Sequence, residues 1–107
     1  MNDKTDREML EYAAKAAGYE VEVDHKGVFH IHEGTGSQSW SPWNPLDDDG
    51  DNRRLQVDLK IELMITDQSA TACFGMVFYS EPLGKDARKA ARRAIVRAAA
   101  DIGRGLK

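Results

Sequence analysis

The apolar positions near the N-terminus recur at the spacing of an α-helix: Met9, Tyr12, Ala13, Ala16 and Ala17. Before them, Thr5 and Glu8 have the residue types and the spacing of a capping box, in which each side chain bonds the backbone N–H of the other residue. Gly18 then supplies the left-handed conformation that ends many helices. Together these signals predict a helix over residues 5–17.

Strict alternation of apolar and polar residues follows over residues 19–32 and predicts a β-hairpin. Residues opposite each other in a hairpin share a face of the sheet, so Val23 should lie opposite Phe29. This register leaves a three-residue loop that ends in Gly27, as a type I turn with a G1 bulge requires.

Residues 55–65 also alternate, yet aspartates are concentrated just before them, in the stretch DDDGD. Alternation alone favours one long strand. Aspartates favour a helix N-terminus, both as caps and through the helix dipole, and so long a strand would be unusual. We therefore predict a helix over residues 49–59 and a strand over residues 61–66, with the long strand as the alternative.

The stretch ATACFGMVFY, residues 70–79, is apolar on both of its alternating faces, which is typical of a central strand covered on both sides. The last element is a basic helix over residues 85–102 with a narrow alanine stripe, and Gly103 ends it. Helices on both sides of the sheet predict an α-β-α layered sandwich.

These elements give the order α-β-β-(α)-β-β-α in a single α+β domain over residues 1–107, with a mostly antiparallel sheet. A chain of this length supports one modest core. The polar segment over residues 33–52 is a long loop within the domain, and loops of this length are usually functional or pinned to the body.

The composition is that of an ordinary soluble protein, with 41% apolar and 31% charged residues. The single cysteine, Cys73, excludes a disulfide within one chain and a Cys-based zinc site, and it suits a reducing cytosol. The N-terminus has no apolar h-region, and no apolar run approaches the length of a membrane span. We therefore expect a cytoplasmic protein without a membrane partner.

The histidines invite a metal hypothesis, because His30 and His32 share one face of the predicted hairpin. The hairpin register places a glutamate opposite each of them, Glu22 and Glu20 respectively. This arrangement favours two carboxylate–imidazole pairs on a solvated face over a metal site.

Other catalytic and ligand motifs are missing from the sequence. The stretch DDDGDN fails as an EF-hand loop, because with Gly50 at position 6 the first ligand position is Pro45. Cys73 lies in a predicted buried strand, where a thiol is usually inert. The chain has no GxSxG sequence and no Gly-rich phosphate loop. We expect no catalytic residue, no metal and no cofactor, and so no enzyme.

The long loop contains the first candidate interaction surface. Its tryptophans either clip the loop onto the body or form a recognition hot spot in a rigid, proline-braced segment. The residues assigned to this candidate are Trp40, Trp43, Asn44, Asp47 and Asp49.

The C-terminal helix offers the second candidate. Residues 85–107 carry a charge of +6, whereas residues 1–84 carry −9. The basic face suits phosphate contacts, unless it pairs with the acidic remainder of the same protein. Its candidate nucleic-acid contacts are Lys85, Arg88, Lys89, Arg92, Arg93 and Arg97.

Three stretches resemble a known family: REMLEYAAKAAGYEV (Arg7–Val21), WNPLDDDGD (Trp43–Asp51) and ARRAIVRAAADIGR (Ala91–Arg104). Together they are similar to small phage and prophage proteins with a phage α-β-α sandwich domain. The resemblance implies an α-β-α layered fold, a bacteriophage origin and action in the cytoplasm of a bacterial host. It brings no established activity and no catalytic residues.

The leading hypothesis is a small non-enzymatic phage accessory protein that binds an unknown host or phage protein. The alternative is a nucleic-acid-binding regulator that uses the basic helix. Self-association, through a sheet edge or the alanine stripe, is a further option that the sequence leaves open.

Overall fold

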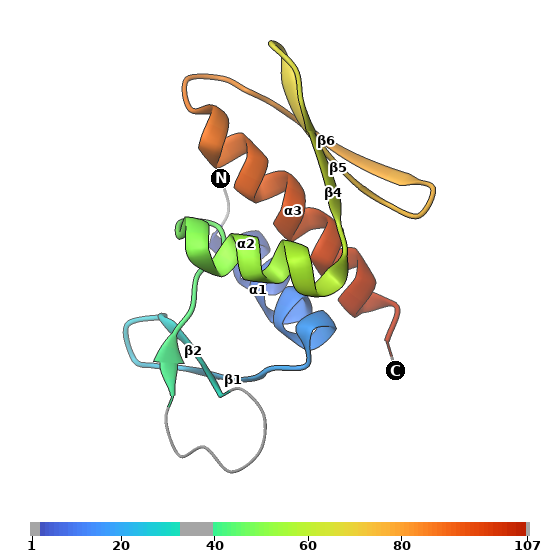
Figure 1. Cartoon of the computed structure of the whole chain (residues 1–107). Coiled ribbons are helices and arrows are strands. Elements are labelled where there is room, and N and C mark those ends of the chain that lie inside the picture. The colour runs from blue at the N-terminus through green and yellow to red at the C-terminus, as the bar shows by residue number, and fades with distance from the viewer. Residues whose placement is uncertain (1–2, 33–39, 107) are drawn as a thin grey trace.

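Three helices lie between two antiparallel sheets (Figure 1). The computed structural model describes residues 3–32 and 40–106, with side chains from residue 6 onward. The elements in chain order are α1 (Asp3–Ala17), β1 (Glu20–Val23), β2 (Phe29–His32), β3 (Ser41–Pro42), α2 (Asp49–Leu59), β4 (Glu62–Ile65), β5 (Ser69–Phe74), β6 (Val77–Pro82) and α3 (Ala87–Arg104). The α+β class and the predicted order of elements are confirmed.

The core is centred on α3, which packs against α1, α2 and the sheet formed by β4, β5 and β6. Small side chains allow the close approach, since the alanines of α3 at positions 94, 98, 99 and 100 are fully buried. At Gly103 the two helices α1 and α3 approach closely, since a Cβ built there would overlap the backbone carbonyl of Tyr12 on α1. The larger core side chains on the helices are Met9, Leu10, Leu55, Ile95 and Val96.

The N-terminal hairpin has the predicted register, with Val23 opposite Phe29 and Val21 opposite Ile31. Its loop closes as expected, because Gly27 takes a φ of +85°. The short strand β3 adds to β2 and places Pro42 opposite His30. The pairing of β3 with β2 therefore attaches the chain after residue 40 to the N-terminal sheet.

Residues 49–66, for which the sequence allowed either a helix and a strand or one long strand, form a helix and then a strand: α2 and β4. Asp48 caps α2, since its side chain accepts from the N–H of Asp51. Lys60 ends α2 in a left-handed conformation, with φ 58° and ψ 45°. The long strand is excluded, because helical geometry buries Leu55 and leaves Val57 exposed.

The first residue of α1 and both ends of α3 differ from the predicted ones. Helix α1 begins at Asp3, so Thr5 is a helical residue and the predicted capping box is wrong. Helix α3 begins after its cap Asp86, which leaves Lys85 outside the helix, and it continues to Arg104. Gly103 therefore does not end α3. Its small size serves the contact with α1.

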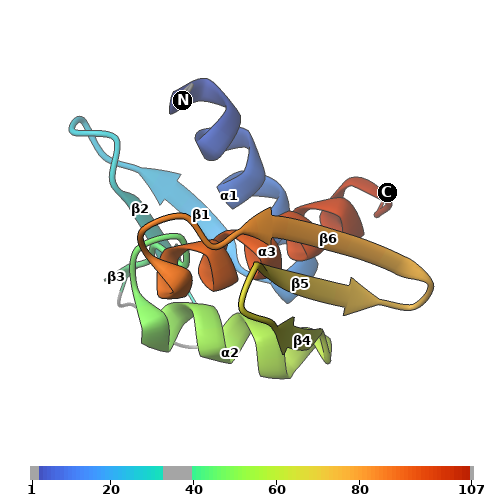
Figure 2. The ribbon, with the colours of Figure 1, turned by 90° about the horizontal axis from the view of Figure 1, so that it is seen from above.

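The predicted central strand over residues 70–79 is wrong, because this stretch folds into the hairpin β5–β6. Gly75 takes a φ of +64°, which allows a tight turn between Phe74 and Val77. Figure 2 shows the two strands extending past the helices to this turn. Helix α3 covers only one face of the sheet β4–β6, where Ala70 and Ala72 are fully buried. The opposite face, which we call the outer face, includes the exposed Phe78.

Candidate functional site

The two tryptophans of the long loop have different roles. Trp43 is 3% exposed, packs edge-on against Tyr19 with ring centroids 5.7 Å apart, and donates its backbone N–H to the carbonyl of Phe29. Trp40 is 38% exposed, and its ring lies 5.3 Å from that of His32. Trp43 therefore clips the loop to the body and offers no side chain to a partner.

The segment after Trp43, which we call the corner (residues 44–52), is closed by its own hydrogen bonds. The Asp51 carboxylate accepts from the backbone N–H of Asn44 at 2.9 Å. The Asn44 amide oxygen accepts from the backbone N–H of Leu46 at 3.0 Å. Because these contacts are local, the corner is a rigid entry to α2.

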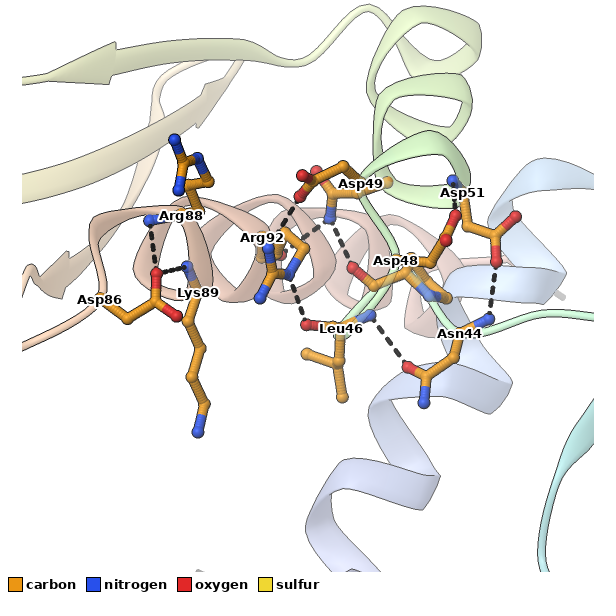
Figure 3. Close-up of polar contacts among 11 residues, drawn as sticks. Asn44, Leu46, Asp48, Asp49, Asp51, Asp86, Arg88, Lys89 and Arg92 are labelled. Carbon is orange, nitrogen blue, oxygen red and sulfur yellow. Dashed lines mark hydrogen bonds and ion pairs between the residues drawn. The ribbon is translucent and has the colours of Figure 1, made fainter.

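Two side chains fasten the corner to α3. Arg92 donates to the carbonyl of Leu46 at 2.8 Å and pairs with the Asp49 carboxylate at 2.7 Å (Figure 3). The buried amide of Asn52 donates to the carbonyls of Pro45, at 2.8 Å, and of Arg92, at 3.0 Å. The corner is therefore a structural joint between helices.

The polar residues assigned to the loop as candidate partner contacts already form hydrogen bonds or ion pairs within the protein. Asn44 bonds Leu46 and also donates to Asp47 at 3.2 Å. Asp49 is exposed but paired with Arg92. Trp40, Asp47 and Asp49 are the exposed members of that candidate surface, and Trp40 is the one that retains an exposed apolar side chain.

The basic face of α3 divides into two groups. Three arginines pair with carboxylates of the same chain: Arg92 with Asp49, Arg93 with Asp6 at 3.2 Å, and Arg97 with Glu81 at 2.7 Å. The other three candidates are exposed, and they lie at or just before the first turn of α3: Lys85, Arg88 and Lys89. Half of the predicted phosphate contacts are therefore directed toward the protein itself.

The predicted hairpin pairing needs one correction at His30. Its register partner is Glu22, as expected, but the carboxylate that its imidazole contacts is that of Asp24, at 3.0 Å. Asp24 also accepts from the backbone N–H groups of Lys26 and Val28. The hydrogen bond with His30, followed by that from Val28, lowers the pKa of the Asp24 carboxyl to about 2. Asp24 is thus a turn-stabilising residue.

The main depression on the described surface has few polar groups that are free to bind a ligand. A depression of about 460 Å³ lies between α1 and the corner, with Leu10, Trp43, Asp48 and Asp51 in its lining. Both carboxylates already accept backbone hydrogen bonds in the corner. Within residues 3–32 and 40–106, no group of three His, Cys, Asp or Glu side chains is placed to hold a metal ion.

An apolar surface on the sheet β4–β6 was not predicted from the sequence. We call it the hairpin surface, and it consists of Met64 (56% exposed), Phe74 (41%), Met76 (92%), Val77 (51%) and Phe78 (61%). The strand register puts Met64 and Phe78 on the outer face and Phe74 and Val77 on the face that α3 partly covers, with Met76 in the turn between the strands. Its polar neighbours Thr71 and Ser80 share a hydroxyl–hydroxyl hydrogen bond of 2.7 Å. Exposed apolar patches of this kind mark interaction sites on soluble proteins. The available sequence signal was Gly75 inside an apolar run, which is typical of a break in a strand.

Known protein families, curated proteins and solved structures were compared with the chain, and none of them matches it. Of the helices in the described ranges, none combines the length and the apolar character needed to cross a bilayer.

Proposed function

We propose that this chain is a small non-enzymatic accessory protein of a phage or prophage, which acts in the bacterial cytoplasm by binding another protein. The hairpin surface carries the proposal, because it contains five of the ten large apolar side chains that are exposed among the described residues. The phage origin and the bacterial host rest on the resemblance of the three sequence stretches described above.

Protein binding has more support than nucleic-acid binding. A phosphate-binding face needs cations that are free to meet the backbone. Arg92, Arg93 and Arg97 instead pair with aspartate or glutamate of the same chain. The hairpin surface has the apolar side chains that a protein partner buries on binding.

The proposal is tested by capture from bacterial lysate with three immobilised variants: Phe78→Ser, Val57→Ser and Trp40→Ala. Val57 is the matched control, since it is 62% exposed but lies on α2, away from the hairpin surface. We expect Phe78→Ser to weaken binding of the captured protein by about 10-fold or more, as for an interface hot spot, and Val57→Ser to bind like the unmodified chain.

Equal capture by Phe78→Ser and the unmodified chain would show that the hairpin surface is not the binding site. If Trp40→Ala lost binding while Phe78→Ser kept it, the binding site would be the loop that contains Trp40 and not the hairpin surface. Circular dichroism of each variant controls for folding.

A further inference from the structure

We propose that a depression between α2 and α3 binds a small ligand through a phosphate group, and that the guanidinium groups of Arg53 and Arg88 hold this group. The inference is independent of the proposed function. The depression reaches the sheet β4–β6 at Leu63, which the strand register places on the side facing α3 and not on the outer face.

The depression is lined by residues from three elements. Helix α2 contributes Asp49 and Arg53, α3 contributes Arg88 and Ala91, and β4 contributes Leu63. Its volume is about 420 Å³, which is within the usual range of small-molecule sites. The lining therefore combines apolar contact area with charged groups at one place.

Helical spacing brings the two arginines to this depression. Residues four apart lie on the same face of a helix, so Arg53 follows Asp49 by one turn of α2, and Arg88 precedes Arg92 by one turn of α3. The ion pair between Asp49 and Arg92, at 2.7 Å, joins the two helices. Arg53 and Arg88 therefore lie beside this joint, one on each helix, and line the same depression.

Both arginines are free to meet an anion. Each is exposed, and neither guanidinium group forms a hydrogen bond or an ion pair with the part of the chain that the structure describes. The carboxylate of the described lining, Asp49, is held by Arg92 instead. Two positive charges thus remain unbalanced at the depression, and such a local excess of one sign attracts a counter-ion.

Guanidinium groups in particular suit a phosphate. Each presents a planar fork of N–H donors that matches two oxygens of a phosphate or carboxylate group. A phosphate group offers three strong acceptor oxygens, so it can bond Arg53 and Arg88 at the same time. A carboxylate has only two oxygens and would satisfy one fork.

The arrangement favours a small ligand over a nucleic-acid strand. A strand needs a row of free cations along its backbone, whereas Arg92, the next residue on this face of α3, is paired with Asp49. Figure 3 shows Lys89 extending to the opposite side of α3 from Arg88. The free guanidinium groups are therefore gathered at one depression and do not form a track along the helix.

The proposal is tested by isothermal titration calorimetry of the full chain with pyrophosphate and with adenosine 5′-monophosphate, in a phosphate-free buffer of low ionic strength. We expect saturable binding of one ligand per chain. Arg53→Ala and Arg88→Ala should each weaken binding by about 10-fold or more, as the loss of a charge-assisted hydrogen bond requires. Binding of pyrophosphate alone would identify a free phosphate as the ligand, whereas binding of both would identify a phosphate ester.

Arg54→Ala and Lys89→Ala are the matched controls, because each removes one positive charge beside a proposed contact. Arg54 pairs with Asp51 at 2.7 Å, and Lys89 points away from the depression. Both controls should bind like the unmodified chain. Equal losses in all four variants would contradict the site, since the ligand would then respond only to overall charge. The absence of saturable binding of either ligand would overturn it, as would binding confined to single-stranded oligonucleotides.

Discussion

Gly103→Ala is expected to destabilise the protein by about 3 kcal/mol, near the upper end of the usual cost of overpacking a core. The added methyl group would overlap the backbone carbonyl of Tyr12. Backbone cannot rotate away as a flexible side chain does, so α1 and α3 must separate. Alanine is the better helix former by ~1 kcal/mol, and this gain offsets only part of the loss.

Urea unfolding followed by circular dichroism measures the effect, with Gly105→Ala as the control. A Cβ at Gly105 would come no closer than 3.5 Å to another atom, and its φ of −77° is suitable for alanine. We expect the control to change the free energy of unfolding by less than ~0.5 kcal/mol. Equal stability of the two variants would show that α1 and α3 do not approach as closely as described.

Asn52→Ala is expected to cost about 2–3 kcal/mol, because it removes the donor to two carbonyls. Asn52 is 7% exposed, so water cannot replace the lost donor without opening the corner. Asn52→Asp should cost more, since it turns the same site into a buried charge that faces the carbonyls of Pro45 and Arg92.

Arg53→Ala is the matched control for Asn52, since the neighbouring side chain is exposed and should change stability by less than ~0.5 kcal/mol. Thermal and urea unfolding of the three variants provide the comparison. If Asn52→Ala were as stable as Arg53→Ala, the corner would not depend on its link to α3.

The parts of the fold that the sequence predicted correctly are set by local chemistry. The hairpin register follows from the alternation around Gly27, which is confined to a few residues. The start of α2 follows from Asp48, whose cap contact with Asp51 lies within three residues. These interactions form between residues that are close along the chain, so one sequence is enough to predict them.

The features that were not predicted depend on distant parts of the chain. Periodicity shows which faces of residues 70–79 are apolar, but not which of them a helix covers. Asn52 and the carbonyl of Arg92 are 40 residues apart, and nothing in either stretch identifies the other. The role of Gly103 depends likewise on α1 passing beside it. Tertiary packing, rather than local propensity, decided each of these cases.

For the candidate surfaces, too, the sequence indicated local features but not the contacts made by distant residues. The position of Trp43 follows from its ring contact with Tyr19 and its backbone hydrogen bond to Phe29, which belong to another part of the fold. The sequence therefore left its role open between a clip and a hot spot. The pairing of the basic helix with acidic residues was foreseen as one interpretation, but its particular partners were not.

The central claim is that a protein covers the hairpin surface when the chain functions. Methionine oxidation tests it with residues that the chain already has. Met64 and Met76 are 56% and 92% exposed in the monomer, whereas Met9 is 6% exposed and serves as a protected reference. Peroxide oxidation, measured by mass spectrometry of the peptides, compares the purified chain with the chain in bacterial cells.

We predict that Met76 and Met64 oxidise severalfold more slowly in the cellular sample than in the purified one, while Met9 stays slow in both. Equal oxidation rates of Met76 in the two samples would contradict the claim.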